Sequence, residues 1–224
     1  AGSTPGVLPA VPAEDETKSP YDAAAIEESA KHRETAAATD EPPAALSVSV
    51  ERHIQLERSE QQVPWGMLMD ASTGSTIYIS SIAPDESPAR EANRRMSEME
   101  HLQAGEYIAE VNGIRDDISS MMREVHMRRR LDLFVRRAFV WDISLSNTGS
   151  VGCSITYDAT SGVSLGISSV LDGPIKSWNE ANPTATVGEG DRIISVNGRT
   201  GSTAELLEMI KSSNKLRLRF SRPA

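Results

Sequence analysis

The serine in Gly162-Val163-Ser164-Leu165-Gly166 has the surroundings of a catalytic nucleophile. In a Gly-x-Ser-x-Gly turn the serine attacks a carbonyl carbon, and a histidine further along the chain takes its proton. That turn must also join a strand to a helix. Here residues 163–170 have the pattern of a strand, and the last histidine, His126, precedes the serine. We therefore interpret the match as coincidental and expect no catalytic residues.

Metal, cofactor and disulfide chemistry have no support in the sequence. Cys153 is the single cysteine, so it has no partner in the chain, and we expect it to be a buried, unreactive thiol. Gly188-Glu189-Gly190 lacks the rest of a dinucleotide-binding fingerprint. The four histidines never fall at ligand spacing from one another, and they are His32, His53, His101 and His126. We expect no metal site and no cofactor.

The chain's acidity is concentrated at one end. It has 224 residues, 38% hydrophobic and 25% charged, with a net charge of −9. Residues 1–45 hold nine acidic and three basic side chains, so they carry two thirds of that charge. An acidic chain repels phosphate backbones, so nucleic acid is not an expected partner. No apolar run reaches the roughly 18 residues of a membrane span, and we expect an intracellular protein, soluble or peripheral, that is not secreted.

Residues 1–45 form an Ala- and Pro-rich extension without the apolar content of a core. Within it, residues 21–38 are predicted as a helix that needs outside support, because isolated helices of this length are marginal in water. The negative charge favours a basic surface as its partner. The chain begins at Ala1 without Met, and both a removed organellar targeting segment and a fragment boundary stay open.

Beyond the extension the pattern changes to short alternating strands with glycine-containing turns. Alternation begins at Leu46, and two helical windows follow at Pro88 to Leu102 and Ile118 to Met127. A strand predicted over Leu131 to Arg137 is followed almost at once by another over Phe139 to Leu145. So short a connection is expected to fix the relative orientation of the segments it joins.

The chain repeats itself at an offset of 85 residues. Gly105-Glu-Tyr-Ile-Ala-Glu-Val-Asn-Gly113 aligns with Gly190-Asp-Arg-Ile-Ile-Ser-Val-Asn-Gly198, and the alignment continues without a gap through Met121-Met122 and Leu206-Leu207. Upstream, Trp65-Gly66-Met67 matches Val151-Gly152-Cys153 at 86. Drift confined to loops is typical of duplicated domains.

Each repeat resembles a PDZ domain, by its apolar-Gly-apolar turn, its Pro-initiated short helix, its Gly-Glu/Asp-x-Ile-x-x-Val-Asn-Gly strand and its later amphipathic helix. The resemblance implies an α+β, mainly β fold: two tandem PDZ-like, partly open β-sandwiches or barrels, each with two helices. The expected domains are 46–137 and 138–224, after the extension 1–45.

The resemblance also implies two peptide-binding grooves. In this family an extended peptide adds to a sheet edge beside a helix, and its terminal carboxylate meets the backbone N–H groups of a tight loop. In the first repeat the implied groove residues are Trp65, Gly66, Met67, Leu68, Ile118, Met122 and Val125. In the second they are Val151, Gly152, Cys153, Ser154, Ile155, Thr203, Leu207 and Ile210.

Both grooves depart from the family's pattern. Neither has histidine at the first helix position, which selects Ser or Thr in the ligand; Ile118 favours an apolar ligand residue, and Thr203 leaves the preference open. Gln61 and Gln62 stand where the family often has a basic residue, and no Lys or Arg lies between Ala138 and Gly152, so weak or absent carboxylate binding stays open. The same apolar residues also fit a simple core, and Trp65 is large enough to fill its own groove or to anchor an adjoining chain.

Two functions follow, and the sequence leaves both open. The first is a non-enzymatic tandem scaffold or adaptor that binds protein C-termini or edge strands. The second is an accessory subunit of a larger complex, for example a photosynthetic or respiratory membrane complex, with the repeats as packing modules and the extension lying along neighbouring subunits. The basic cluster Arg128-Arg129-Arg130 is either a solvated face or a site for an anionic surface.

Overall fold

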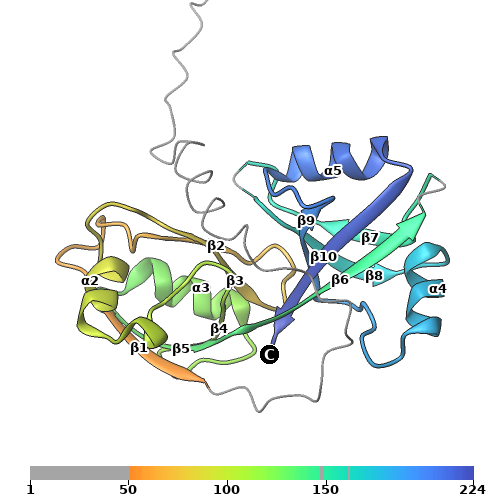
Figure 1. Cartoon of the computed structure of the whole chain (residues 1–224). Helices are drawn as coiled ribbons and strands as arrows, with labels where there is room; N and C mark the ends of the chain where they lie inside the picture. Colours follow the sequence, from red (N-terminus) through yellow and green to blue (C-terminus); the bar gives the residue numbers. More distant parts are fainter. Residues whose placement is uncertain (1–50, 147–148, 161) are drawn as a thin grey trace, which may run out of the picture. The chain divides into compact units, whose positions relative to one another are not determined.

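A computed structural model describes residues 51–146, 149–160 and 162–224. The extension 1–45, the helix expected over 21–38 and the alternating residues 46–50 lie outside the described residues. Figure 1 shows two sheets, each with helices that lie between its strands along the chain. Among the described residues no helix is long and apolar enough to cross a membrane.

The first repeat forms a five-stranded antiparallel sheet in the order β1-β5-β4-β3-β2, which places β2 at an edge. The 3-10 turn η1 spans Glu98–Glu100 and follows α2. The strands and helices are β1 Arg52–Glu57, β2 Met67–Asp70, β3 Ile77–Ile82, α2 Pro88–Arg95, β4 Tyr107–Val111, α3 Ile118–Met127 and β5 Arg130–Arg136.

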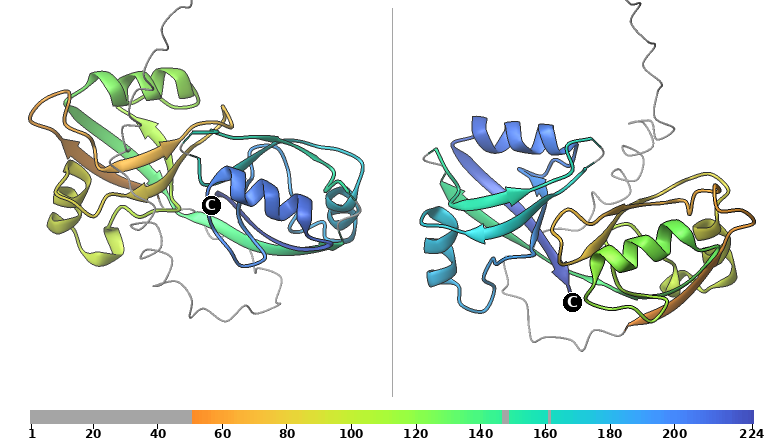
Figure 2. Two further views of the ribbon diagram at one scale, coloured as in Figure 1. Left: turned by 90° about the horizontal axis from the view of Figure 1, so that it is seen from above. Right: turned by 180° about the vertical axis from the view of Figure 1, so that it is seen from behind.

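The second repeat reproduces this plan with the strand order β6-β10-β9-β8-β7, so β7 takes the edge position of β2. Both views of Figure 2 show α3 (green) and α5 (blue), each against the sheet of its own repeat. The expected pair of mainly β domains, each with two helices, is confirmed by this matching order. The elements are β6 Ala138–Ser146, β7 Cys153–Thr156, β8 Leu165–Val170, α4 Pro174–Ala181, β9 Arg192–Val196, α5 Thr203–Ser212 and β10 Lys215–Pro223.

Each repeat has its own apolar core. In the first, Leu131, Leu133 and Val135 alternate inward from β5 and are fully buried, as a strand with one face on a core requires. In the second, Leu216, Leu218 and Phe220 do the same from β10. The repeated alternation seen in the sequence therefore builds two cores rather than one.

The helix predicted over Pro88 to Leu102 was wrong in its second half, because α2 ends at Arg95. An asparagine of α2 explains the end: the Asn93 side-chain amide donates to the Leu102 carbonyl (2.9 Å) and its oxygen accepts from the Leu102 N–H (2.8 Å). Asn179 makes the same two bonds to Val187 in the second repeat (2.7 and 2.8 Å). This paired asparagine clamp turns the chain back towards the sheet in both repeats.

The two sheets are joined through one residue. Strand β5 ends at Arg136 and β6 begins at Ala138, one residue earlier than the sequence predicted. The carbonyl of the intervening Arg137 accepts a hydrogen bond from the N–H of Ala224 (2.9 Å), so the end of the chain is tied to the junction. A connection this short has no slack.

Candidate functional site

The two predicted carboxylate-binding loops share one backbone conformation. Gly66 and Gly152 have φ of 77° and 79°, the left-handed region that glycine enters without strain. Neither has room for a side chain: a Cβ would lie 2.2 Å from the Ser87 Cβ in the first loop and 2.9 Å from the Gly173 Cα in the second. The glycine at the centre of each loop is therefore required by both conformation and space.

Hydrogen bonds hold the carbonyl groups of both loops in the same direction. In the first loop, Trp65 O accepts from Ala89 N (3.0 Å) and Gly66 O accepts from Ala83 N (2.8 Å). In the second, Val151 O accepts from Ile175 N (3.1 Å) and Gly152 O from Leu171 N (2.8 Å). Since these carbonyls are engaged by the chain around the start of α2 or α4, only the loop amides could meet a ligand, and of these the Gly152 N–H donates to the Ser150 hydroxyl oxygen.

The first loop is filled by its own side chain. Trp65 is 5% exposed, and its indole N–H donates to the Val125 carbonyl in the last turn of α3 (2.8 Å). The Arg58 guanidinium lies 4.4 Å from the ring centroid, close enough for a cation–π contact. Trp65 therefore occupies the space between the loop and the end of α3.

Arg58 is a basic residue near the first loop that the sequence analysis missed. It is 7% exposed and donates to the carbonyls of Arg128 (2.9 Å) and His126 (2.7 Å). Burial lowers its pKa. The only signal in the sequence is an arginine six residues before Pro64. Its guanidinium donates to carbonyls at the end of α3, so it is not available as a partner for a ligand carboxylate.

The second loop carries a smaller residue and a different hydrogen bond. Val151 stands where the first repeat has Trp65, and the Ser150 hydroxyl accepts from the Gly152 N–H (3.2 Å). Cys153, Ser154 and Ile155 continue along the edge strand β7 and are all half-buried. Cys153 is therefore half-buried rather than fully buried as predicted, and burial still raises the pKa of its thiol to about 11.

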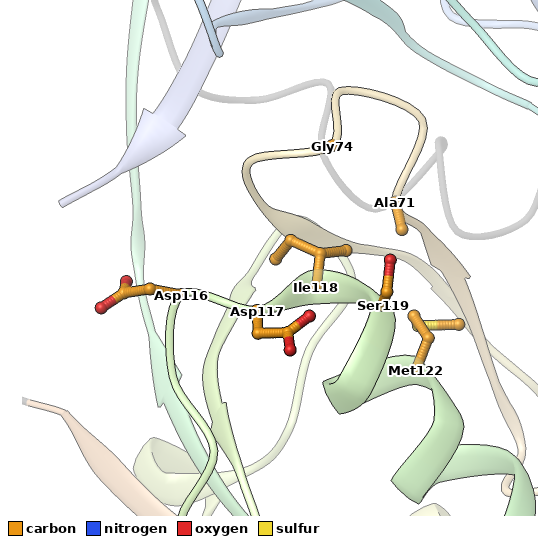
Figure 3. Close-up of a pocket in the computed structure, with 7 residues that line it drawn as sticks. All are labelled: Ala71, Gly74, Asp116, Asp117, Ile118, Ser119 and Met122. Carbon is orange, nitrogen blue, oxygen red and sulfur yellow. The ribbon is translucent and has the colours of Figure 1, made fainter.

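At the other end of the first groove the structure is open. A hollow of about 470 Å³ lies between the first turn of α3 and the residues after β2. In Figure 3 Ile118, Ser119 and Met122 face the loop that carries Ala71 and Gly74. Asp117 caps α3 by accepting from the Ser120 N–H (3.0 Å). The lining is therefore mixed, with apolar side chains on the helix and acidic groups at its start.

At the same end of the second groove the chain packs closely. Thr203, the first residue of α5, is 2% exposed. Its hydroxyl donates to Asp158 O (3.1 Å) and its N–H to Gly162 O (2.9 Å). A Cβ on Gly162 would lie 2.7 Å from the Thr203 methyl group. Because its hydroxyl already donates to Asp158 O, Thr203 covers this end of the groove and does not offer its hydroxyl to a ligand.

The predicted groove residues divide into core and edge. Most of the buried ones belong to the two cores, and the half-buried ones lie on the edge strands or on the helix beside them. Buried are Trp65, Gly66, Met67, Val125, Val151, Gly152, Thr203 and Ile210; half-buried are Leu68, Ile118, Met122, Cys153, Ser154, Ile155 and Leu207. The half-buried residues are the ones that an added strand would reach.

The basic cluster is partly neutralised. Arg128 pairs with Glu124 (2.8 Å) and Arg130 with Asp132 (3.8 Å). Arg129 and Arg130 also line a hollow of about 500 Å³ together with Arg95, Glu57 and others. Within the described residues, no group of three or more His, Cys, Asp or Glu is placed to hold a metal ion. The cluster thus lies on a surface that carries both basic and acidic side chains.

No family model matches the chain, and no curated protein matches it. Among solved structures the chain is similar to INAD PDZ45 in complex with NG2 peptide, with 17% identity, a TM-score of 0.34, and coverage of 81% of this chain and 94% of that one. It is also similar to INAD PDZ45 in complex with NORPA CC-PBM, with 15% identity, a TM-score of 0.33, and coverage of 78% and 91%.

Proposed function

We propose that this protein is a non-catalytic protein-interaction module in which the second repeat binds the C-terminal end of a partner chain. The observation that supports it most is the left-handed Gly152 loop at the start of the edge strand β7, with its carbonyls held by the chain around α4. An added strand gains backbone hydrogen bonds from β7, and a terminal carboxylate gains those of the loop amides. Displacing the weak Ser150 hydrogen bond costs little by comparison.

The ligand of this groove is short. Strand β7 offers four residues, Cys153–Thr156, and the chain beyond it packs against Thr203. The apolar wall is formed by Leu207, which is half-buried on α5. We therefore propose an extended C-terminal segment of about four residues, in which the residue next to Thr203 is not selected for a hydroxyl.

The first groove has a different role in this proposal. Trp65 and Arg58 occupy the place of a ligand's terminal residue, so this groove accepts no chain terminus. Its open hollow at Ile118 and Met122 suits a single apolar side chain presented by an edge strand beside β2. The two repeats thus differ in ligand class, although their folds match.

The test is a binding screen on the full chain with C-terminal peptides, each paired with its C-terminal amide. We expect free acids to bind and amides to bind at least about tenfold more weakly, because the loop N–H groups lose a charged partner. Val151→Trp is expected to abolish binding by filling the second loop. Val140→Trp, on the exposed side of β6, is the matched control.

Three results would overturn the proposal. The first is a folded chain that binds no peptide, the second is equal binding of acids and amides, and the third is undiminished binding by Val151→Trp. Loss of binding in Val140→Trp as well would show that a tryptophan acts through the fold and not through the groove.

A second candidate is an accessory subunit whose contacts are electrostatic. The hollow lined by Arg95, Arg129 and Arg130 favours it, since it offers cationic groups to an acidic neighbouring chain. Charge reversal at Arg129 and Arg130 should then weaken association with that complex in pull-downs at low salt, and leave binding of C-terminal peptides unchanged. Unchanged association with the complex would exclude this candidate.

A further inference from the structure

A buried ion pair links the two repeats. Arg192 of β9 is fully buried, and its Nη1 lies 2.7 Å from Asp70 Oδ2, at the end of β2 in the first repeat. Its Nη2 donates to the Asp70 carbonyl (3.0 Å). Neighbouring Tyr78 contributes its ring, 5.4 Å from the Arg192 guanidinium. Both Nη atoms of Arg192 are therefore engaged, whereas its buried Nε has no hydrogen-bond partner, and a fully buried arginine needs a counter-charge such as Asp70.

The serine of the Gly-x-Ser-x-Gly sequence belongs to this ion pair. Ser164 is fully buried, its hydroxyl donates to Asp70 Oδ2 (3.0 Å), and it accepts from Arg192 Nη1 (3.1 Å). Gly166 also lies against the first repeat, and it leaves no room for a side chain, because a Cβ there would lie 2.5 Å from the Thr73 methyl group. The motif therefore has a structural use, in which the serine bonds across the repeats and the glycine admits the neighbouring loop.

The ion pair is continuous with the covered end of the second groove. Ser164 lies two residues after Gly162, whose carbonyl accepts from the Thr203 N–H and whose own N–H donates to Asp158 O (3.2 Å). Val163 between them is half-buried. With Asp70 holding Ser164 and Thr203 holding Gly162, three residues of chain are fixed at both ends.

We propose that Asp70, in the first repeat, is a positioning residue for the groove of the second repeat. It holds Ser164, and through Ser164 the backbone at Gly162 and Asp158, against the first residue of α5. That contact sets where a ligand strand beside β7 must end. The inference rests on the proposed function of the second groove, but the contact itself exists without a ligand.

The position is specific to this pair of repeats. At the repeat offset Thr156 takes the place of Asp70, and Tyr107 takes the place of Arg192. The second repeat therefore has no acid at the end of its own edge strand. Its groove end depends on a carboxylate that the other repeat supplies.

The test is amide hydrogen exchange on the full chain, followed residue by residue by NMR. Asp70→Asn should accelerate exchange of the Thr203 and Gly162 amides by about tenfold, because the anchor of Ser164 is weakened. Ser164→Ala removes one hydroxyl and should give about threefold at the same amides. The Asn197 amide, bonded to Arg217 O (2.8 Å) in the same repeat, should not change.

Asp142→Asn is the matched control, since Asp142 is an exposed-face carboxylate of the second repeat that pairs with Arg217 and Arg219. It should leave the Thr203 amide unchanged. Unchanged exchange at Thr203 in both Asp70→Asn and Ser164→Ala overturns the inference, as does equal acceleration at Asn197. If Asp70→Asn fails to fold, Ser164→Ala decides alone. Failure of the peptide screen would overturn the proposed function and leave this result standing.

Discussion

The two grooves are closed at opposite ends. In the first repeat the loop end is filled by Trp65 under Arg58, and the start of α3 borders an open hollow. In the second repeat the loop end carries the small Val151, and the start of α5 is covered by Asp158 and Gly162. The backbone turns and strand orders are the same, so a few side chains decide which end of a common groove is accessible.

The comparison separates what the shared fold requires from what differs between the repeats. The glycines that shape the loops are kept in both repeats, because the backbone requires them. The residues that fill or cover the groove differ, since the fold tolerates several sizes there. Ligand class is therefore expected to follow from Trp65 and Val151 rather than from the loop conformation.

The largest expected effect is on the filled loop. Trp65→Ala should lower the free energy of unfolding by about 4 kcal/mol, because it leaves a cavity and removes the indole hydrogen bond to the Val125 carbonyl. Val151→Ala should cost only about 1–2 kcal/mol. Urea unfolding of the two variants measures both, and equal losses would contradict the view that only the first loop is filled.

The next largest effect is expected at Tyr107 and Arg192, which take equivalent positions in the two repeats and each contact the other repeat. Arg192→Met should cost about 3 kcal/mol, because it leaves the buried Asp70 without its counter-charge. Tyr107→Phe should cost about 1 kcal/mol, the value of the hydrogen bond between its hydroxyl and Ser221 (2.9 Å). Thermal unfolding measures both losses. A smaller loss in Arg192→Met than in Tyr107→Phe would contradict the view that the ion pair is the stronger contact between the repeats.

Two carboxyl groups, Asp191 in the second repeat and Glu51 in the first, should respond to acid in opposite directions. Burial raises the pKa of Asp191 to about 6, so its folded form prefers the proton and the free energy of unfolding falls as pH rises from about 4 to 6. Asp191→Asn should remove a fall of about 2 kcal/mol in the free energy of unfolding between pH 4 and 6. Urea midpoints at several pH values measure it, and an unchanged slope would count against the burial of this carboxyl.

In the first repeat, hydrogen bonds from Arg115 and Arg136 lower the pKa of Glu51 to about 2. Its contribution is therefore present above the ordinary pKa of 4.5 and is lost as pH falls towards 2. Glu51→Gln should flatten the acid limb of the same titration. If Glu51→Gln instead changed the stability only between pH 4 and 6, Glu51 would not be the group that titrates at low pH.

The smallest effect is chemical rather than energetic. Cys153 should react with iodoacetamide about a hundredfold more slowly than an exposed cysteine at neutral pH, because burial raises its pKa to about 11. Mass spectrometry of the intact chain follows the single thiol directly. A reaction as fast as that of the unfolded chain would show that β7 is open at this residue.

The sequence predicted the elements that depend on local patterns. Alternation and the repeat offset identified the strands, and the loop glycines followed from the resemblance. The Asn93 clamp, Arg58 and the pair of Asp70 with Arg192 were not predicted, because each depends on residues brought together by the fold. Asp70 and Arg192 lie 122 positions apart. The available signal was the alignment of Tyr107 with Arg192, where an aromatic residue in one repeat stands opposite a charged residue in the other.

The single residue between β5 and β6 has a mechanical consequence. When a partner held in one groove is pulled against an attachment on the other repeat, Arg137 offers almost no length to extend. Tension therefore passes directly from one sheet into the other, and the hydrogen bond from Ala224 to Arg137 lies in its path. In a force-extension record the first event would be rupture of sheet structure, without the gradual lengthening that a flexible tether shows before its domains yield.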